Sequence, residues 1–167
     1  WFNRAVNIAS KSIYCIHTTA ASHSRVFIVE VMGHKVGWLT LHAGISGGAD
    51  IILIPEIPYD IDKWVEAINR SNKAGKGFTI LAVAEGAVSK AVATLTKTDF
   101  KKKQEEYRIQ YPSVAYQLAS QLVNKLDLDL RITIPGHMPR GRSPCPSDRV
   151  LSTRLGSSSA NLTFHES

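Results

Sequence analysis

The chain has 167 residues, of which 44% are hydrophobic and 20% are charged, and its formal net charge at pH 7 is +6. This composition is typical of an ordinary globular protein and excludes a disordered or fibrous chain. The positive charge favours an anionic partner, although charge alone does not distinguish a polyanion from a small phosphate ester.

Helices and strands alternate along the first half of the chain. Apolar residues spaced three or four apart indicate the helices, and β-branched runs that are apolar on both faces indicate the strands. In chain order we expect a helix to about His17, a strand over 26–32, a helix over 39–45, a strand over 51–54, a helix that Asp60 caps and that ends at 75–77, and a strand over 78–84.

The second half is less regular. In chain order we expect a solvated loop or helix end over 97–108, a helix from Val114 to Leu126, a strand over 128–134, a loop over 135–146, and a helix that begins at Asp148 and stops at Gly156. The strand over 128–134 alternates between apolar and polar residues, so one side of it is wet or faces a ligand. The order of the elements predicts an α/β protein, with a three-layer, mostly parallel, Rossmann-like sheet and helices on both faces. Because the chain opens within a helical pattern, we expect the sheet to be incomplete at the N-terminus.

The cysteines and the apolar runs indicate the cellular compartment of the protein. Cys15 and Cys145 fit neither a CxxC metal pair nor a disulfide framework, and free thiols are usual in the cytoplasm. No apolar run reaches the ~18 residues that a membrane span needs. Arg4 and Lys11 interrupt the apolar residues that a signal peptide would require. We therefore expect a cytoplasmic protein with no membrane partner.

Anion-binding groups occur where predicted strands end. His137 and Arg140 lie in the loop after the last strand, where an imidazole and a guanidinium can converge on a phosphate. The alternative is a solvated basic turn. Glu85 follows an apolar strand and could accept hydrogen bonds from sugar hydroxyls, or could stabilise a helix N-terminus. Met32 and Gly33 end another strand before a helix, an arrangement that α/β proteins use to bind phosphates and sugars.

Three segments, 18–56, 83–86 and 131–156, resemble the 6-phosphofructokinase family. They contain the runs VMGHKVGW and GGADIILIPEIP, then VAEG, then RITIPGHMPRGRSPCPSDRVLSTRLG. The resemblance implies that residues 1–167 are the sugar-phosphate-binding part of a phosphofructokinase domain. The part that binds the phosphoryl donor would lie upstream. The implied activity is the glycolytic phosphorylation of fructose 6-phosphate to fructose 1,6-bisphosphate, with Mg²⁺ and either ATP or pyrophosphate bound mainly by the upstream part.

Two arginines correspond in this family to residues that act across a subunit boundary. Arg25 matches an arginine that reaches into the neighbouring subunit's site and helps to hold the phosphoryl group in transit, so it is the implied catalytic residue. Arg131 matches a second cross-subunit arginine, which binds the sugar phosphate. The resemblance therefore implies a homo-oligomer, either a dimer or a tetramer. Taken without the family, Arg25 could equally extend from a strand start into solvent.

Five further positions match residues that act within one subunit. His137 and Arg140 match phosphate contacts. Met32, Gly33 and Glu85 match groups that position the sugar. With the two arginines, these make up the predicted substrate-binding site.

The chain also departs from the family pattern. His34 stands where the family usually has arginine, Pro139 and Arg142 alter the phosphate loop, and Ser147 replaces a frequent tyrosine. A proline removes a backbone N–H, and an arginine in place of glycine disfavours positive φ. These changes leave open a non-catalytic relic or assembly fragment that binds without turnover. A polyanion-binding module is a third reading, which the sequence does not favour because it lacks interleaved basic and aromatic residues.

Overall fold

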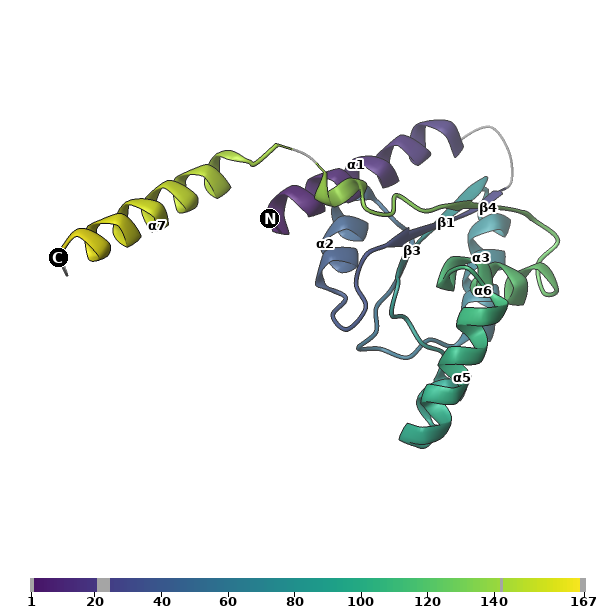
Figure 1. Cartoon of the computed structure of the whole chain (residues 1–167). Coiled ribbons are helices and arrows are strands. Elements are labelled where there is room, and N and C mark those ends of the chain that lie inside the picture. Colours follow the sequence, from purple (N-terminus) through teal and green to yellow (C-terminus); the bar gives the residue numbers. More distant parts are fainter. Residues whose placement is uncertain (1, 21–24, 142, 166–167) are drawn as a thin grey trace.

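A four-stranded parallel sheet lies at the centre of the computed structural model, which describes residues 2–20, 25–141 and 143–165 (Figure 1). The strands are β1 (Arg25–Val31), β2 (Ile51–Leu53), β3 (Phe78–Ala84) and β4 (Asp129–Thr133). Their order in the sheet is β2-β3-β1-β4, and each neighbouring pair is parallel.

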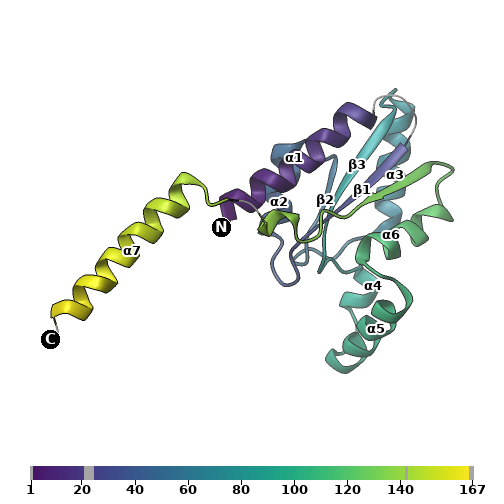
Figure 2. The same cartoon turned by 45° about the horizontal axis from the view of Figure 1, so that its top comes forward.

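Helices cover both faces of this sheet. The helices of the described chain are α1 (Phe2–Ala20), α2 (Trp38–Gly47), α3 (Ile61–Lys73), α4 (Lys90–Ala93), α5 (Lys97–Gln110), α6 (Val114–Val123) and α7 (Pro146–His165), with a 3₁₀ turn η1 (Met138–Arg140), and four of them pack on the sheet. Helices α1 and α2 lie on one face, and α3 and α6 lie on the other (Figures 1 and 2). The predicted fold class, a three-layer α/β protein with a parallel sheet, is confirmed.

The central strand β1 is buried from both sides because its side chains alternate between two apolar clusters. Ile28 packs with Leu118 of α6, and Val29 packs with Ala9 of α1. All four residues are fully buried. Burying a side chain the size of isoleucine or leucine contributes about 1.5–3 kcal/mol, so these two layers hold the strand ends in fixed positions.

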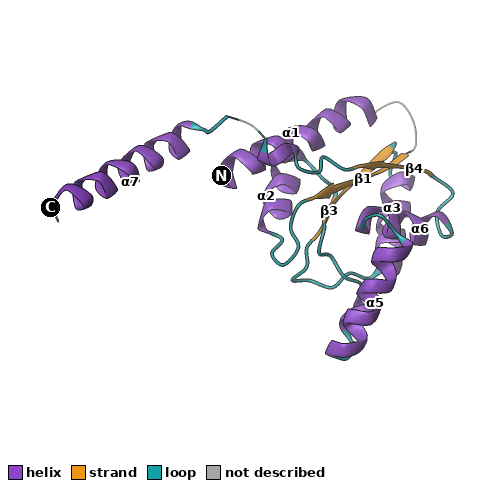
Figure 3. Cartoon of the chain, viewed as in Figure 1, coloured by secondary structure: helices purple, strands orange, loops and turns teal. Residues whose placement is uncertain are grey.

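Two segments differ from the sequence-based expectation (Figure 3). The segment 97–108, expected as a loop or helix end, belongs to helix α5. Thr96 caps that helix by accepting from the Asp99 amide at 3.3 Å, and its lysine, glutamine and glutamate residues are good helix formers. The last helix does not stop at Gly156 but continues to His165, because one glycine costs a helix only about 1 kcal/mol. This helix, α7, projects away from the body of the molecule (Figure 1).

Candidate functional site

A cavity of about 640 Å³ opens beside the carboxyl ends of β1 and β3. Four of the predicted site residues line it: Met32, Gly33, Glu85 and His137. They come from three separate segments of the chain, as the prediction required. The volume falls within the range of about 300–1,000 Å³ that is usual for small-molecule sites.

The parallel pairing of β1 and β3 places these residues side by side. Val31 and Ala84 are register partners, so Met32 and Glu85 each follow directly after a paired strand end. Backbone hydrogen bonds continue beyond the strands, since the Glu85 amide donates to the Val31 carbonyl at 3.0 Å and the Gly86 amide to the Gly33 carbonyl at 3.1 Å. The carboxylate and the Met-Gly turn are therefore held together by main chain.

Close approach explains the glycines at this junction. A Cβ at Gly86 would lie 1.8 Å from the His34 carbonyl oxygen, well inside any tolerable contact. Gly33 has a φ of +154°, and a Cβ there would lie 2.9 Å from the Val36 carbonyl oxygen. A side chain at Gly86 would force the Glu85 turn away from the Met-Gly turn, whereas a side chain at Gly33 would strain the Met-Gly turn itself, so both glycines are steric requirements of the cavity wall.

The third wall comes from the turn after β4. His137 precedes η1, which is closed by a hydrogen bond of 3.1 Å from the Gly141 amide to the Met138 carbonyl. This turn lies beside α1 (Figure 1). The backbone of Arg140 belongs to η1, whereas its predicted phosphate contact depends on a side chain that lies outside what the structure describes.

The two remaining predicted residues do not line this cavity. Arg25 is the first residue of β1 and Met32 follows the last, a separation of about 23 Å at ~3.3 Å per residue. Arg25 and Arg131 instead meet at Asp129 on the edge strand. The Nε and Nη2 of Arg131 donate to Asp129 Oδ2 at 3.0 and 2.9 Å. Arg25 Nε lies 3.0 Å from the same oxygen, close enough for an ion pair but not aligned as a hydrogen bond.

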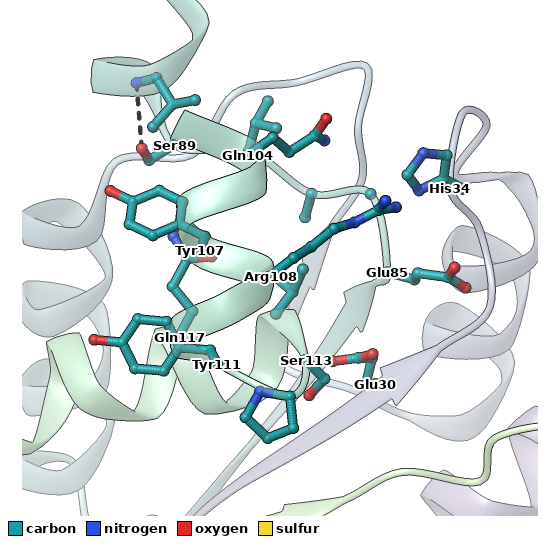
Figure 4. A pocket seen from close by; sticks show the side chains of 16 residues that line it. Glu30, His34, Glu85, Ser89, Gln104, Tyr107, Arg108, Tyr111, Ser113 and Gln117 are labelled. Atoms are coloured by element: carbon teal, nitrogen blue, oxygen red, sulfur yellow. Dashed lines mark hydrogen bonds between the residues drawn. The ribbon is translucent and has the colours of Figure 1, made fainter. Parts of the chain in front are cut away.

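A second, smaller cavity of about 260 Å³ shares His34 and Glu85 with the first. Side chains of α5 line its other side, among them Tyr107 and Arg108, and Arg108 extends across the space toward His34 and Glu85 (Figure 4). This wall is absent from the sequence-based prediction, in which the segment 97–108 is a solvated loop or helix end. The signal was present: Gln104 and Tyr107 with Arg108 follow the i, i+3, i+4 spacing of one helix face.

Glu30 is a buried acidic residue one position before the end of β1, and the sequence-based prediction did not include it. Its Oε2 accepts a hydrogen bond of 2.7 Å from the Ala115 amide, in the first turn of α6. Glu30 thus does the work expected of the N-cap residue Ser113, whose buried hydroxyl finds no partner among the described residues. A carboxylate within an apolar strand has to be hydrogen-bonded when it is buried. The glutamate in the run RVFIVEV was therefore the sequence signal for such a contact.

Two shifts in acidity occur on the α3 side of the sheet. Burial raises the pKa of Tyr59, and the neighbouring Tyr107 adds to the rise, so the phenol stays protonated even in moderately alkaline solution. The pKa of Asp60 is lowered: desolvation is the largest single influence and acts to raise it, but hydrogen bonds from Lys90 and the Asp62 amide, with the charge of Lys90, together lower it by more.

The described residues contain no group of three or more His, Cys, Asp or Glu side chains placed to hold a metal ion. None of the helices in the described ranges is both long enough and apolar enough to cross a membrane.

Comparison with known proteins gives consistent matches. A family model described as phosphofructokinase matches residues 2–163. The chain is 44% identical over 163 residues to the ATP-dependent 6-phosphofructokinase of Spirochaeta thermophila, covering 98% of this chain and 44% of that protein. It is 38% identical over 176 residues to the protein of the same name from Propionibacterium freudenreichii, covering 96% and 47%. The chain therefore spans less than half the length of these curated relatives.

Solved structures agree. Pichia pastoris phosphofructokinase in the T-state superposes with a TM-score of 0.69 at 36% identity, covering 96% of this chain and 16% of that one. A pyrophosphate-dependent phosphofructokinase from Marinobacter aquaeolei gives a TM-score of 0.65 at 20% identity, covering 98% and 39%, which is a likeness of fold.

Proposed function

The chain belongs to the phosphofructokinase family, and we propose that it forms the fructose 6-phosphate site of a glycolytic enzyme that makes fructose 1,6-bisphosphate. In this proposal residues 1–167 are the sugar-phosphate-binding part of the domain, and the groups that bind the phosphoryl donor lie outside them. The observation that carries the proposal is the shared cavity of Met32, Gly33, Glu85 and His137, drawn from three separate segments.

Each residue has a physical task in this site. The Glu85 carboxylate accepts hydrogen bonds from sugar hydroxyls, while Met32 and Gly33 shape the wall against which the sugar lies. His137 and Arg140 bind the 6-phosphate by charge-assisted hydrogen bonds. Phosphoryl transfer needs little covalent help from a protein, so the contribution of these residues is to place the acceptor for in-line attack.

We propose that Arg25 and Arg131 act on the site of a neighbouring copy, with Arg25 stabilising the phosphoryl group in transit. The position of Arg25 about 23 Å along β1 from Met32 supports this assignment, since it cannot reach the cavity of its own subunit. A homo-oligomer, at least a dimer, is then needed for a complete site.

The proposed donor is ATP, with Mg²⁺ bound to its phosphates, in the cytoplasm. Support for ATP comes from the names of the curated relatives, which are ATP-dependent enzymes at 38–44% identity. Pyrophosphate remains the alternative donor to test. In this proposal the Mg²⁺ is bound with the donor, mainly by groups outside residues 1–167.

A non-catalytic relic is the alternative suggested by Pro139 and Arg142 in the phosphate loop. It is not favoured, because the identity of 44% extends over 98% of the chain. The proline also sits in η1, a turn whose closing hydrogen bond is made without its missing N–H.

The test is to produce the protein at its full natural length and to measure phosphorylation of fructose 6-phosphate with ATP and with pyrophosphate. We expect turnover with ATP. Replacing Arg140 by alanine should raise the KM for fructose 6-phosphate about 10- to 100-fold, from ~1.4–2.7 kcal/mol of lost binding. Lys102→Ala, on the exposed helix α5, is the matched loss of one positive charge. Absence of turnover with both donors would exclude the proposed activity, and an unchanged KM would remove Arg140 from the site.

A further inference from the structure

The carboxylate of Asp129 contacts the guanidinium groups of two arginines, Arg25 and Arg131. Its Oδ2 accepts two hydrogen bonds from Arg131, through Nε at 3.0 Å and Nη2 at 2.9 Å. Arg25 Nε lies 3.0 Å from the same oxygen. One carboxylate oxygen therefore lies between two guanidinium groups that would otherwise repel each other.

The sheet itself fixes this arrangement. Arg25 and Asp129 are register partners in the parallel pair of β1 and β4. Arg131 follows Asp129 by two residues, so its side chain emerges on the same face of the sheet. Strand pairing therefore brings the three groups together, so their proximity is set by the backbone of the sheet.

Folding stability does not account for the cluster. The side chains of Arg25, Asp129 and Arg131 are 28%, 45% and 57% exposed, and exposed ion pairs contribute little to stability. The bonds also leave donors free. In the described part of the chain, no acceptor bonds the Nη groups of Arg25 or Nη1 of Arg131, so each guanidinium still presents an edge that could bind a phosphate oxygen.

We infer that Asp129 is a positioning residue, which orients Arg25 and Arg131 for an anionic group carried on another copy of the protein. The inference rests on the proposed function, in which both arginines serve the neighbouring subunit's sugar-phosphate site. By holding the inner edge of Arg131 and balancing one of the two charges, Asp129 keeps both side chains extended and close together. Less side-chain freedom is then lost when the phosphate binds.

Kinetics of the full-length protein test this role. Asp129→Asn keeps the size of the side chain but removes its charge, and we expect kcat/KM for fructose 6-phosphate to fall about tenfold while the melting temperature stays within a degree or two. Asp129→Glu should restore part of the loss. Asp127→Asn, an exposed residue just before the same strand, is the control and should behave as wild type.

A double-mutant cycle separates positioning from a structural effect. If Asp129 acts through Arg131, then Asp129→Asn should have a much smaller effect in an Arg131→Ala background than in the wild type. The same holds with Arg25→Ala. Full additivity with both arginines, or an Asp129→Asn enzyme as active as the Asp127→Asn control, would overturn the inference.

A second readout does not depend on turnover. Arginines can be labelled with phenylglyoxal and the rate at each residue followed by peptide mass spectrometry. We expect Asp129→Asn to speed labelling of Arg25 and Arg131 at least threefold, with Arg70 of α3 unchanged as the internal reference. We also expect inorganic phosphate to protect both arginines better when Asp129 is present. If neither ATP nor pyrophosphate supports phosphorylation, the proposed function fails, but the labelling still tests whether Asp129 pairs with Arg25 and Arg131. Unchanged labelling rates in Asp129→Asn would refute that pairing.

Discussion

Substituting Gly86 by alanine should damage the candidate site, because an added Cβ makes a shorter contact there than at any other described glycine. The new Cβ would lie 1.8 Å from the His34 carbonyl oxygen and 3.0 Å from its Cα. Backbone has to move by about 1.2 Å to restore even a 3.0 Å contact, because the clashing atom is main chain and cannot rotate away. The movement separates the Glu85 turn from the Met-Gly turn.

Two effects should follow from this displacement. Overpacking of this kind costs about 1–3 kcal/mol of folding free energy. A misplacement of about 1 Å in a group that positions substrate costs on the order of 100-fold in rate. We therefore expect Gly86→Ala to lower kcat/KM for fructose 6-phosphate about 100-fold, while the protein remains folded.

The matched control is Gly77→Ala, at the approach to the same strand, where an added Cβ meets no atom of the described chain within 4 Å. Urea unfolding and steady-state kinetics of both variants provide the comparison. If Gly86→Ala matches Gly77→Ala in both stability and kcat/KM, the close approach of the two turns is not a requirement of the site, and the reasoning is refuted.

Two further predictions concern the body of the fold. Leu118→Ala, at a fully buried position of α6, should lower the free energy of unfolding in urea by about 2–5 kcal/mol, whereas Val123→Ala, exposed on the same helix, should change it little; equal losses would contradict the packing of α6 against β1. The folded-state pKa of Asp60 lies below its ordinary value of about 3.9, so its contribution to stability is present above that pH and is lost as pH falls through the lower, folded-state pKa. Asp60→Asn should therefore weaken the pH dependence of unfolding below about pH 4, and identical profiles for the two proteins would show that Asp60 has no such role.

The sequence predicted those elements whose local pattern and packing agree. The strand Phe78–Ala84 has the predicted bounds, because a run of apolar residues with a glycine before it and Glu85-Gly86 after it leaves little choice. Asp60 was identified as a cap and accepts from the Asp62 amide at 3.2 Å. Helix α5 was missed because none of its residues is buried, so no apolar stripe marks it.

The candidate site was predictable to the extent that it depends on strand ends. The resemblance and the parallel-sheet rule together brought Met32, Glu85 and His137 to one edge, and the cavity contains all three. Glu30 and Arg108 were not found although local clues were present, because the role of Glu30 depends on α6 packing on β1 and that of Arg108 on where α5 lies. The departure at His34 gave no hint that a guanidinium from α5 extends toward that residue (Figure 4).

The strand order of the sheet also governs when the cavity can exist during synthesis. The partner of β1 on one side, β3, emerges from the ribosome about 50 residues later, and its partner on the other side, β4, about 100 residues later. Until His137 has been synthesised after β4, the turns after β1 and β3 lack the third wall of the cavity. A nascent chain therefore carries Met32, Gly33 and Glu85 before His137 is available to complete the cavity, so a chaperone or a stalled ribosome at that stage would hold a chain whose candidate site is still open.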